Sequence, residues 1–224
     1  MKKAKLELRL LGIVIPSIFI IGAMVFIPAG TLDFWEGWVF LFALFIPMFF
    51  VFIYMIRHER RLLEKRMNVK EKREKQKFIQ LFNTFLFVAS MMIAGLDHRY
   101  GWSYVPFWLV IASDMLMFTG YFFFIKSMLH NEYASRVIEV QKGQKIIDTG
   151  PYAVVRHPMY AAGILMYLFV PVALGSFWAM IPLLLLPAML VFRLLDEEKA
   201  LIKGLKGYKR YMKKVKYRLI PWIW

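Results

Sequence analysis

Two short polar segments of the sequence stand next to long apolar runs. The first is GPYAVVRHPMY (150–160), where Arg156, His157 and Tyr160 come just before an apolar stretch. Proline is favoured in the first turn of a helix, because the N–H that it lacks would be unpaired there. Pro158 is therefore predicted to begin a helix, with His157 at its N-cap. The positive end of a helix, a histidine and an arginine together favour the binding of an anion.

The second segment is RLLDEEKALI (193–202), which comes where the same apolar run ends. Arg193 and Glu197 are four residues apart, so on a helix they share one face. This spacing predicts a mixed-charge site. A plainer interpretation is also open, in which Asp196–Glu198 are acids in the first turn of a cytoplasmic helix.

The apolar run between the two segments, 158–195, is interrupted at Pro171 and Gly175. These interruptions predict two helices joined by a very tight turn. A helical hairpin brings its two ends together, so the flanking polar segments are expected to meet at the membrane surface. The side chains expected to meet there are His157, Tyr160, Arg193 and Glu197.

The composition indicates a membrane protein. The 224 residues are 60% hydrophobic, with a mean hydropathy of +0.53, which exceeds the apolar share of a soluble domain. The absence of cysteine excludes disulfides, thiolate zinc sites, iron–sulfur clusters and cysteine nucleophiles. The four histidines lack the spacing of metal ligands, so no metal is expected. Neither a Rossmann nor a P-loop glycine motif is present.

Four apolar stretches are long enough to cross a bilayer, which takes roughly 20 apolar residues. No small-residue cleavage site follows the first stretch, so it is interpreted as a span and not as a signal peptide. Together with the hairpin, the pattern predicts an all-α, polytopic integral membrane protein with about six membrane-crossing helices. The four stretches are Leu10–Ile27, Trp38–Ile56, Phe78–Leu96 and Tyr104–Ile125.

The basic residues, which give a net charge of +15, are placed on alternate connections between these spans. Because lysine and arginine mark the cytoplasmic side, this pattern predicts that both termini and the site are cytoplasmic. The basic loop 57–77 is expected to contact anionic lipid headgroups. No nucleic-acid-binding signature is present, so nucleic acid is not expected as a partner. Of the 30 lysines and arginines, 28 lie in four segments: 1–9, 57–77, 126–156 and 199–218.

The polar content divides the chain into two predicted regions. Residues 1–126 hold the four N-terminal spans and the basic loop. Residues 127–224 hold a cytoplasmic segment, the hairpin 158–195 and a cytoplasmic C-terminal helix. This second region is expected to bind a cofactor and to carry the chemistry.

The motifs of the second region resemble those of a known family. GPYAVVRHPMY, an apolar hairpin, RLLDEE, YKRY and IP follow one another in order between about residues 131 and 221. This ordered set is similar to that of the isoprenylcysteine carboxyl methyltransferases. They belong to a wider group of integral-membrane methyltransferases that includes the phospholipid N-methyltransferases. The sequence differs from the family pattern in reading LKGY where FGxxY is usual, which blurs the register of Tyr208 and Tyr211.

The resemblance implies S-adenosylmethionine as the methyl donor and the lipid bilayer and a lipophilic substrate as partners. It also implies that Arg193 binds the carboxylate of a prenylcysteine-like acceptor, and that Arg193 and Glu197 are the catalytic residues. In the family pattern, 144–147 corresponds to the strip that contacts the adenosyl part. The implied cofactor-binding residues are Gln144, Lys145, Ile146, Ile147, Tyr152, His157, Pro158, Met159, Tyr160 and Glu197.

The implied chemistry fits the residue types. A carboxylate acceptor is already ionised at neutral pH, so it needs alignment and exclusion of water but no general base. An amine acceptor would profit from a base, and Glu198 is the nearest carboxylate without another expected role. Three alternatives stay open: phospholipid N-methylation, a membrane reductase that uses NADPH, and a transport or scaffold protein without enzymatic activity.

Overall fold

A computed structural model describes residues 3–67, 71 and 73–224 of the chain, and every regular element in this part is a helix. Residues 68–70 and 72, in the predicted basic loop, lie outside the described part. The all-α prediction is therefore confirmed for the described residues. The helices are α1 (Lys3–Ala29), α2 (Trp35–His58), α3 (Arg60–Arg66), α4 (Glu74–Tyr100), α5 (Phe107–Leu129), α6 (Pro151–Val154), α7 (Pro158–Ala173), α8 (Met180–Leu183), α9 (Leu186–Gly204) and α10 (Tyr208–Lys214).

Four helices of the described part are long and apolar enough to cross a membrane. They coincide with the four predicted spans. The first three are longer by a few residues at both ends, whereas the fourth begins three residues later than predicted and ends four residues later: Glu7–Ala29, Trp35–His58, Glu74–Tyr100 and Phe107–Leu129. Large apolar side chains on α1 and α2 are exposed, including Phe19, Phe49 and Phe50. Such surfaces are stable only against lipid or another apolar partner, which supports an integral membrane protein.

The predicted hairpin is formed by α7 on one side and by α8 and α9 on the other. Its turn lies at Gly175, whose φ of +70° is a left-handed conformation that favours glycine. The expectation that Pro171 interrupts the helix is wrong. Pro171 lies inside the last turns of α7 and is buried there, and its carbonyl accepts a hydrogen bond from Ser176 N (3.0 Å) in the turn. The returning arm breaks a second time, between α8 and α9.

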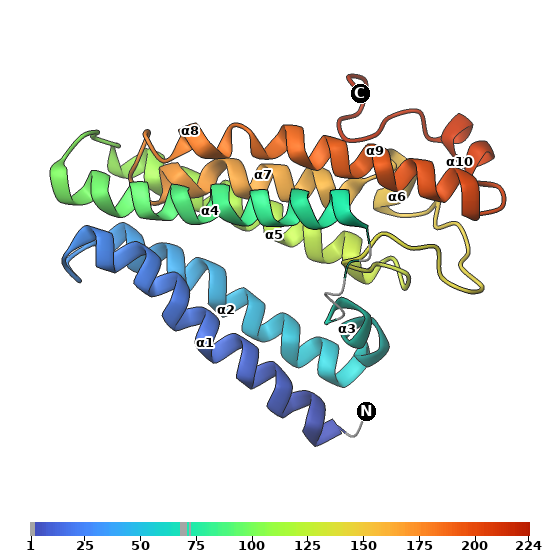
Figure 1. Ribbon diagram of the computed structural model, residues 1–224, viewed down its shortest axis with the longest axis horizontal. Coiled ribbons are helices and arrows are strands. Elements are labelled where there is room, and N and C mark those ends of the chain that lie inside the picture. The colour runs from blue at the N-terminus through green and yellow to red at the C-terminus, as the bar shows by residue number, and fades with distance from the viewer. Residues whose placement is uncertain (1–2, 68–70, 72) are drawn as a thin grey trace.

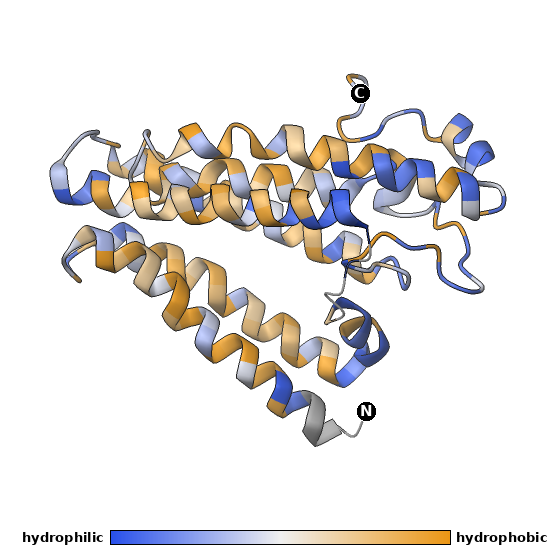
Figure 2. Ribbon diagram, in the orientation of Figure 1, coloured by the Kyte–Doolittle hydropathy of each residue, from blue (hydrophilic) through white to orange (hydrophobic). Residues whose placement is uncertain are grey.

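The helices form two groups (Figure 1). α4, α5, α7, α8 and α9 lie side by side, whereas α1 and α2 form a pair that contacts the others at one end and diverges toward the other. Hydrophilic residues concentrate at the diverging end (Figure 2). We call it the basic end, where α2 and α5 finish and α4 and α7 begin. The other, here called the opposite end, holds the turns at residues 30–34, 101–106 and 174–179.

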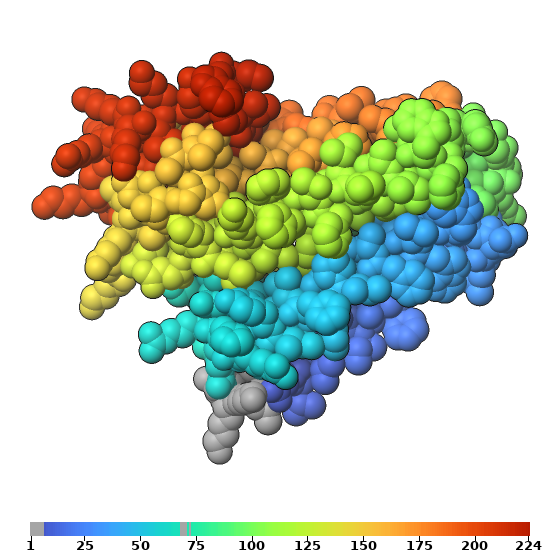
Figure 3. All heavy atoms as spheres, turned by 180° about the vertical axis from the view of Figure 1, so that it is seen from behind, coloured from blue at the N-terminus to red at the C-terminus, as the bar shows by residue number. Residues whose placement is uncertain are grey.

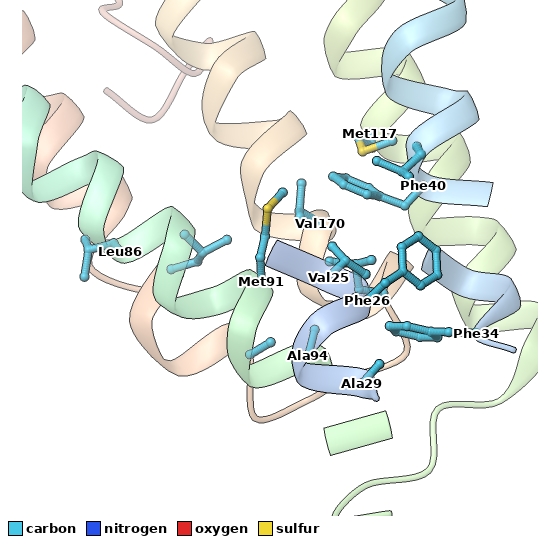
Figure 4. Packing of buried hydrophobic residues seen from close by; sticks show 14 of the residues in the cluster. Val25, Phe26, Ala29, Phe34, Phe40, Leu86, Met91, Ala94, Met117 and Val170 are labelled. Carbon is cyan, nitrogen blue, oxygen red and sulfur yellow. The ribbon is translucent and has the colours of Figure 1, made fainter. Parts of the chain in front are cut away.

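The two groups pack against each other through one apolar core near the opposite end (Figure 4). Val25 of α1, Phe40 of α2 and Met91 of α4 are fully buried in it. The contact between α1 and α4 is close, because a Cβ at Gly95 would lie 2.5 Å from the Val25 carbonyl oxygen. Between membrane helices, a small residue of this kind lets two backbones approach and stabilises them by packing.

A polar network also holds the opposite end together, around Asp97 of α4. Its carboxylate accepts hydrogen bonds from Ser103 N (2.7 Å) and from the hydroxyls of Ser103 and Ser176. Asp97 is only 1% exposed. The network therefore joins α4 to the following turn and to the turn of the hairpin.

Candidate active site

One cavity of about 1250 Å³ lies at the basic end and continues between the two helix groups. Residues from both predicted regions of the chain line it. All eleven site residues predicted from the sequence are among the lining residues, and their roles stay predictions. These are Gln144, Lys145, Ile146, Ile147, Tyr152, His157, Pro158, Met159, Tyr160, Arg193 and Glu197.

The start of α7 places the first group of these residues. α7 begins at Pro158 with His157 as its N-cap residue, as the proline position predicts. The His157 carbonyl accepts hydrogen bonds from the backbone N–H groups of Tyr160 (3.1 Å) and Ala161 (3.2 Å). Tyr160 therefore lies in the first turn, and its ring meets the His157 ring edge to face with 5.8 Å between the centroids.

The two arms of the hairpin meet at Tyr160 and Glu197. The Tyr160 hydroxyl donates a 2.6 Å hydrogen bond to Glu197 Oε2. Arg193 lies one turn earlier on the same helix, and its Nη1 donates to Gln76 Oε1 of α4 (2.9 Å). Its Nη2 donates to the Arg136 carbonyl. The predicted meeting of the hairpin ends is thus present, and α4 and the 130–150 segment also fix the arginine.

Glu198 has a different environment from its neighbour Glu197. It is 3% exposed and accepts hydrogen bonds from Arg156 Nε (2.7 Å), His157 Nε2 (3.3 Å) and Arg218 Nε (2.9 Å). Burial opposes its ionisation, but the hydrogen bonds from His157, Arg218 and Arg156 outweigh burial and lower the pKa of Glu198 to about 2. The interpretation of Glu198 as a carboxylate free for base catalysis is therefore wrong.

Arg156 also differs from expectation. Besides Glu198, its guanidinium donates to the carbonyls of Val215 (2.9 Å) and Lys216 (2.8 Å). Its donors face the C-terminal segment, so the expectation that it helps to bind an anion is wrong. It attaches the C-terminal segment to the start of α7, together with backbone bonds from Arg156 and His157 to Tyr217 and Arg218.

The segment between α5 and α7 contributes many of the residues that line the cavity, and the C-terminal segment lies beside it (Figure 3, yellow and red). Tyr152 of α6 is buried, and its carbonyl accepts a 2.7 Å hydrogen bond from the Tyr211 hydroxyl of α10. Burial raises the pKa of Tyr152 to about 12, so its phenol is protonated at neutral pH. Ile146 packs against the apolar cluster of α10.

Two arginines of the cavity were not predicted from the sequence. Arg66 of α3 and Arg136 line the cavity together with Arg193. Burial and the nearby charge of Arg136 lower the pKa of Arg66 to about 10, so Arg66 stays positively charged at neutral pH. Arg66 Nη1 donates to the Ser135 carbonyl (3.3 Å). No sequence signal separates Arg66 from the other basic residues of the loop 57–77.

The cavity changes character along its length. At the basic end its lining is polar and charged, whereas between the helix groups it is mostly apolar. The apolar part is closed on one side by α1 and α2 and on the other by α4, α7 and α9. Its lining includes Ile13, Val14, Ile21, Leu44, Phe45, Met48, Phe52, Phe87, Met166, Leu186 and Leu190.

Comparison with known proteins gives one finding about this region. Residues 108–207 match the family model of the phospholipid methyltransferases. The matched segment is similar to integral-membrane methyltransferases and contains the start of α7, Arg193 and Glu197. The match does not separate prenylcysteine from phospholipid acceptors. No curated protein matches the chain.

Proposed function

We propose that this protein is a membrane methyltransferase that transfers a methyl group from S-adenosylmethionine to a lipophilic acceptor. The observation that carries the proposal is the junction of Tyr160, Glu197 and Arg193. It lies where the polar end of one cavity becomes an apolar slot, and in the segment that matches the methyltransferase family. A polar donor and an acceptor with an apolar tail both fit such a cavity.

The residues present fit the donor. S-adenosylmethionine would supply the methyl group from a positively charged sulfonium, and an ionised glutamate is a suitable partner for that charge. Glu197 lines the cavity and is fixed by the Tyr160 hydroxyl. Gln144, Lys145, Ile146 and Ile147 line the same end. We assign these four to the adenosyl part, and Tyr152, His157, Pro158 and Met159 to the remaining contacts.

The acceptor that fits best is a carboxylate of the prenylcysteine type. Such a nucleophile needs no general base. Glu198 accepts hydrogen bonds from two arginines and a histidine and has a pKa of about 2, which makes it a poor base. We assign Arg193 to the carboxylate, which a guanidinium can hold through two donors. The apolar slot between the helix groups would hold the tail.

A phospholipid amine is the second candidate, and one observation favours it. Arg66 and Arg136 line the cavity together with Arg193. Three guanidinium groups exceed what one carboxylate requires, and arginine clusters are typical of phosphate binding. In this alternative the arginines would hold the phosphate of the headgroup.

We infer the orientation from the charge pattern. Lysine and arginine concentrate at the basic end, so this end and both termini would face the cytoplasm. In the proposed division, residues 1–126 form the N-terminal spans and residues 127–224 form the cofactor-binding region. Gln76 and Arg66 of the first region would complete the site of the second.

Thermal unfolding of the detergent-purified protein tests the donor. S-adenosylhomocysteine should raise the unfolding temperature, because a ligand that binds only the folded state stabilises it. Glu197→Gln should reduce the shift given by S-adenosylmethionine, whose sulfonium is charged, more than the shift given by S-adenosylhomocysteine, whose sulfur is neutral, while the glutamine keeps an acceptor for the Tyr160 hydroxyl. A shift with NADPH alone would favour a reductase. No shift with either ligand would favour a transport or scaffold role.

A methyl-transfer assay separates the two acceptors. The protein is incubated with methyl-labelled S-adenosylmethionine and either N-acetyl-S-farnesylcysteine or phosphatidylethanolamine vesicles. Alkali releases label from a methyl ester as methanol but leaves an N-methyl group in place. Label released from the farnesylcysteine product supports the carboxylate, whereas alkali-stable label in the lipid supports the phospholipid. In the second case, Arg66→Gln should weaken use of the lipid.

A further inference from the structure

The phenol of Tyr208, at the start of α10, is buried in an unusual way. Tyr208 is 4% exposed, and its hydroxyl is buried without a hydrogen-bond partner among the described residues. Leaving such a buried donor unpaired is unfavourable, because it has given up its hydrogen bonds to water. Tyr208 nevertheless lines the cavity of the proposed site. Its position is understandable if a bound molecule accepts the hydrogen bond.

The surroundings of Tyr208 limit the kind of ligand that can accept its hydrogen bond. The phenol packs in an apolar cluster whose members come from α9, α10 and the 130–150 segment. Burial and the nearby charges of Glu198 and Glu197 raise the pKa of Tyr208, so the phenol is protonated at neutral pH and acts as a donor. The cluster consists of Leu205, Tyr208, Tyr211 and Val215, with Val140, Ile146, Leu201 and Met212 packed against them.

The neighbouring Tyr211 differs from Tyr208, because its hydroxyl has a hydrogen-bond partner within the protein. Both tyrosines lie on α10, are buried, and line the cavity. Tyr211 donates its hydroxyl to the Tyr152 carbonyl at 2.7 Å and so joins α10 to α6. Tyr211 therefore has a structural bond within the protein, whereas Tyr208 lacks one in the described part of the chain.

We propose that Tyr208 is a ligand-binding residue that donates a hydrogen bond to the heterocyclic base of the methyl donor. A nucleobase has apolar faces and acceptor nitrogens at its edge, which matches apolar walls with a single buried donor. Ile146 and Leu201, which also line the cavity, supply the walls. This inference rests on the proposed function. The family match ends at residue 207, so it does not include Tyr208.

The test compares Tyr208→Phe with Tyr211→Phe, which remove one hydroxyl each from the same helix. Without ligand, Tyr208→Phe should unfold at the same temperature as the wild type or higher, whereas Tyr211→Phe should unfold at a lower temperature. The dissociation constant for S-adenosylhomocysteine, measured by calorimetry, should rise about two- to tenfold in Tyr208→Phe, as expected for the loss of one hydrogen bond.

A second ligand locates the contact. 5′-Methylthioadenosine keeps the base but lacks the amino-acid end, so Tyr208→Phe should weaken it by the same factor. An effect on S-adenosylhomocysteine alone would overturn the assignment to the base. Unchanged affinity for both ligands, or a destabilised ligand-free Tyr208→Phe, would overturn the role of Tyr208 without touching the proposed function. Absence of binding to the wild type would overturn both.

Discussion

Each end of the bundle holds a buried carboxylate with several hydrogen-bond donors, Asp97 at the opposite end and Glu198 at the basic end, and the partners of these two carboxylates differ. Asp97 at the opposite end accepts hydrogen bonds from serine hydroxyls and a backbone N–H. Glu198 at the basic end accepts them from two arginines and a histidine. Asp97 joins one helix to two turns, whereas Glu198 joins the start of α7 to the C-terminal segment beside the cavity.

The difference shows how one bundle can combine a rigid end with a binding end. The donors to Asp97 are uncharged hydroxyl and backbone groups, and they fix two turns at that end of the bundle. The two arginines and the histidine hold the Glu198 carboxylate in place. Glu197, the adjacent residue, faces the cavity instead and accepts a hydrogen bond from Tyr160. The two neighbouring glutamates therefore differ in position: Glu198 supports the start of α7, whereas Glu197 lines the cavity.

Removal of Glu198 should have the largest effect. Glu198→Ala leaves the Arg156 guanidinium, whose side chain is 4% exposed, without its carboxylate. Breaking a buried ion pair in this way costs about 3–5 kcal/mol of unfolding free energy. Thermal unfolding of the variant in detergent measures this loss of stability. Asp148→Ala is the matched control, because Asp148 pairs with Lys214 on the surface and should matter little. Equal effects of the two variants would contradict a supporting role for Glu198.

Removal of Asp97 should have the next largest effect. Asp97→Ala removes the acceptor shared by Ser103 and Ser176, and hydrogen bonds to a charged group contribute about 1.5–3 kcal/mol. The unfolding temperature should fall, while the dissociation constant for S-adenosylhomocysteine should stay near the wild-type value. The exposed Asp33, at the same end, is the control. A large loss of affinity in Asp97→Ala would show that the two ends are not independent.

A methyl group at Gly95 tests the close packing of the opposite end. Gly95→Ala would place a Cβ against the backbone of α1, and overpacking of this kind costs about 1–3 kcal/mol. Gly12→Ala is the control, since a Cβ at Gly12 meets no atom within 4 Å. If both variants unfold like the wild type, α1 and α4 are less tightly packed than described.

Lowering the pH should gradually reduce the contribution of Glu198 to the free energy of unfolding. Its pKa is about 2 in the folded protein, well below the ordinary glutamate value of 4.5. The lowered value means that the stabilisation is complete above pH 4.5 and is lost as the pH falls toward 2. Between pH 7 and pH 4 the loss is about 1 kcal/mol. The difference in unfolding temperature between the wild type and Glu198→Gln should therefore shrink on acidification. A constant difference would contradict the ion pairs.

Local patterns in the sequence predicted much of the hairpin and of the site. Pro158 marks the start of α7 because the preference for proline in a first turn is a property of the backbone alone. The spacing of Arg193 and Glu197 gives a shared face because helical periodicity is local. Tyr160 then meets Glu197 because the hairpin returns the chain to the same end of the bundle.

Contacts between distant segments could not be predicted in the same way. Gln76, which holds Arg193, is 117 residues away in the chain. The distinction between Glu197 and Glu198 depends on where the C-terminal segment packs, and no periodicity contains that information. Tyr208 belongs to this class as well, because its role follows from a hydroxyl left unpaired by the surrounding fold.

The close contact at Gly95 also has a mechanical consequence. It lies near one end of α1, and the helix pair diverges from the bundle beyond it (Figure 1). From Val25 to the beginning of α1 at Lys3 the helix extends about 33 Å, so a rotation of about 10° about the contact would move the far end by roughly 6 Å. The pair of α1 and α2 is therefore held close to the bundle near one end only. A tilt of α1 and α2 about this contact would therefore widen or narrow the apolar slot between the two helix groups.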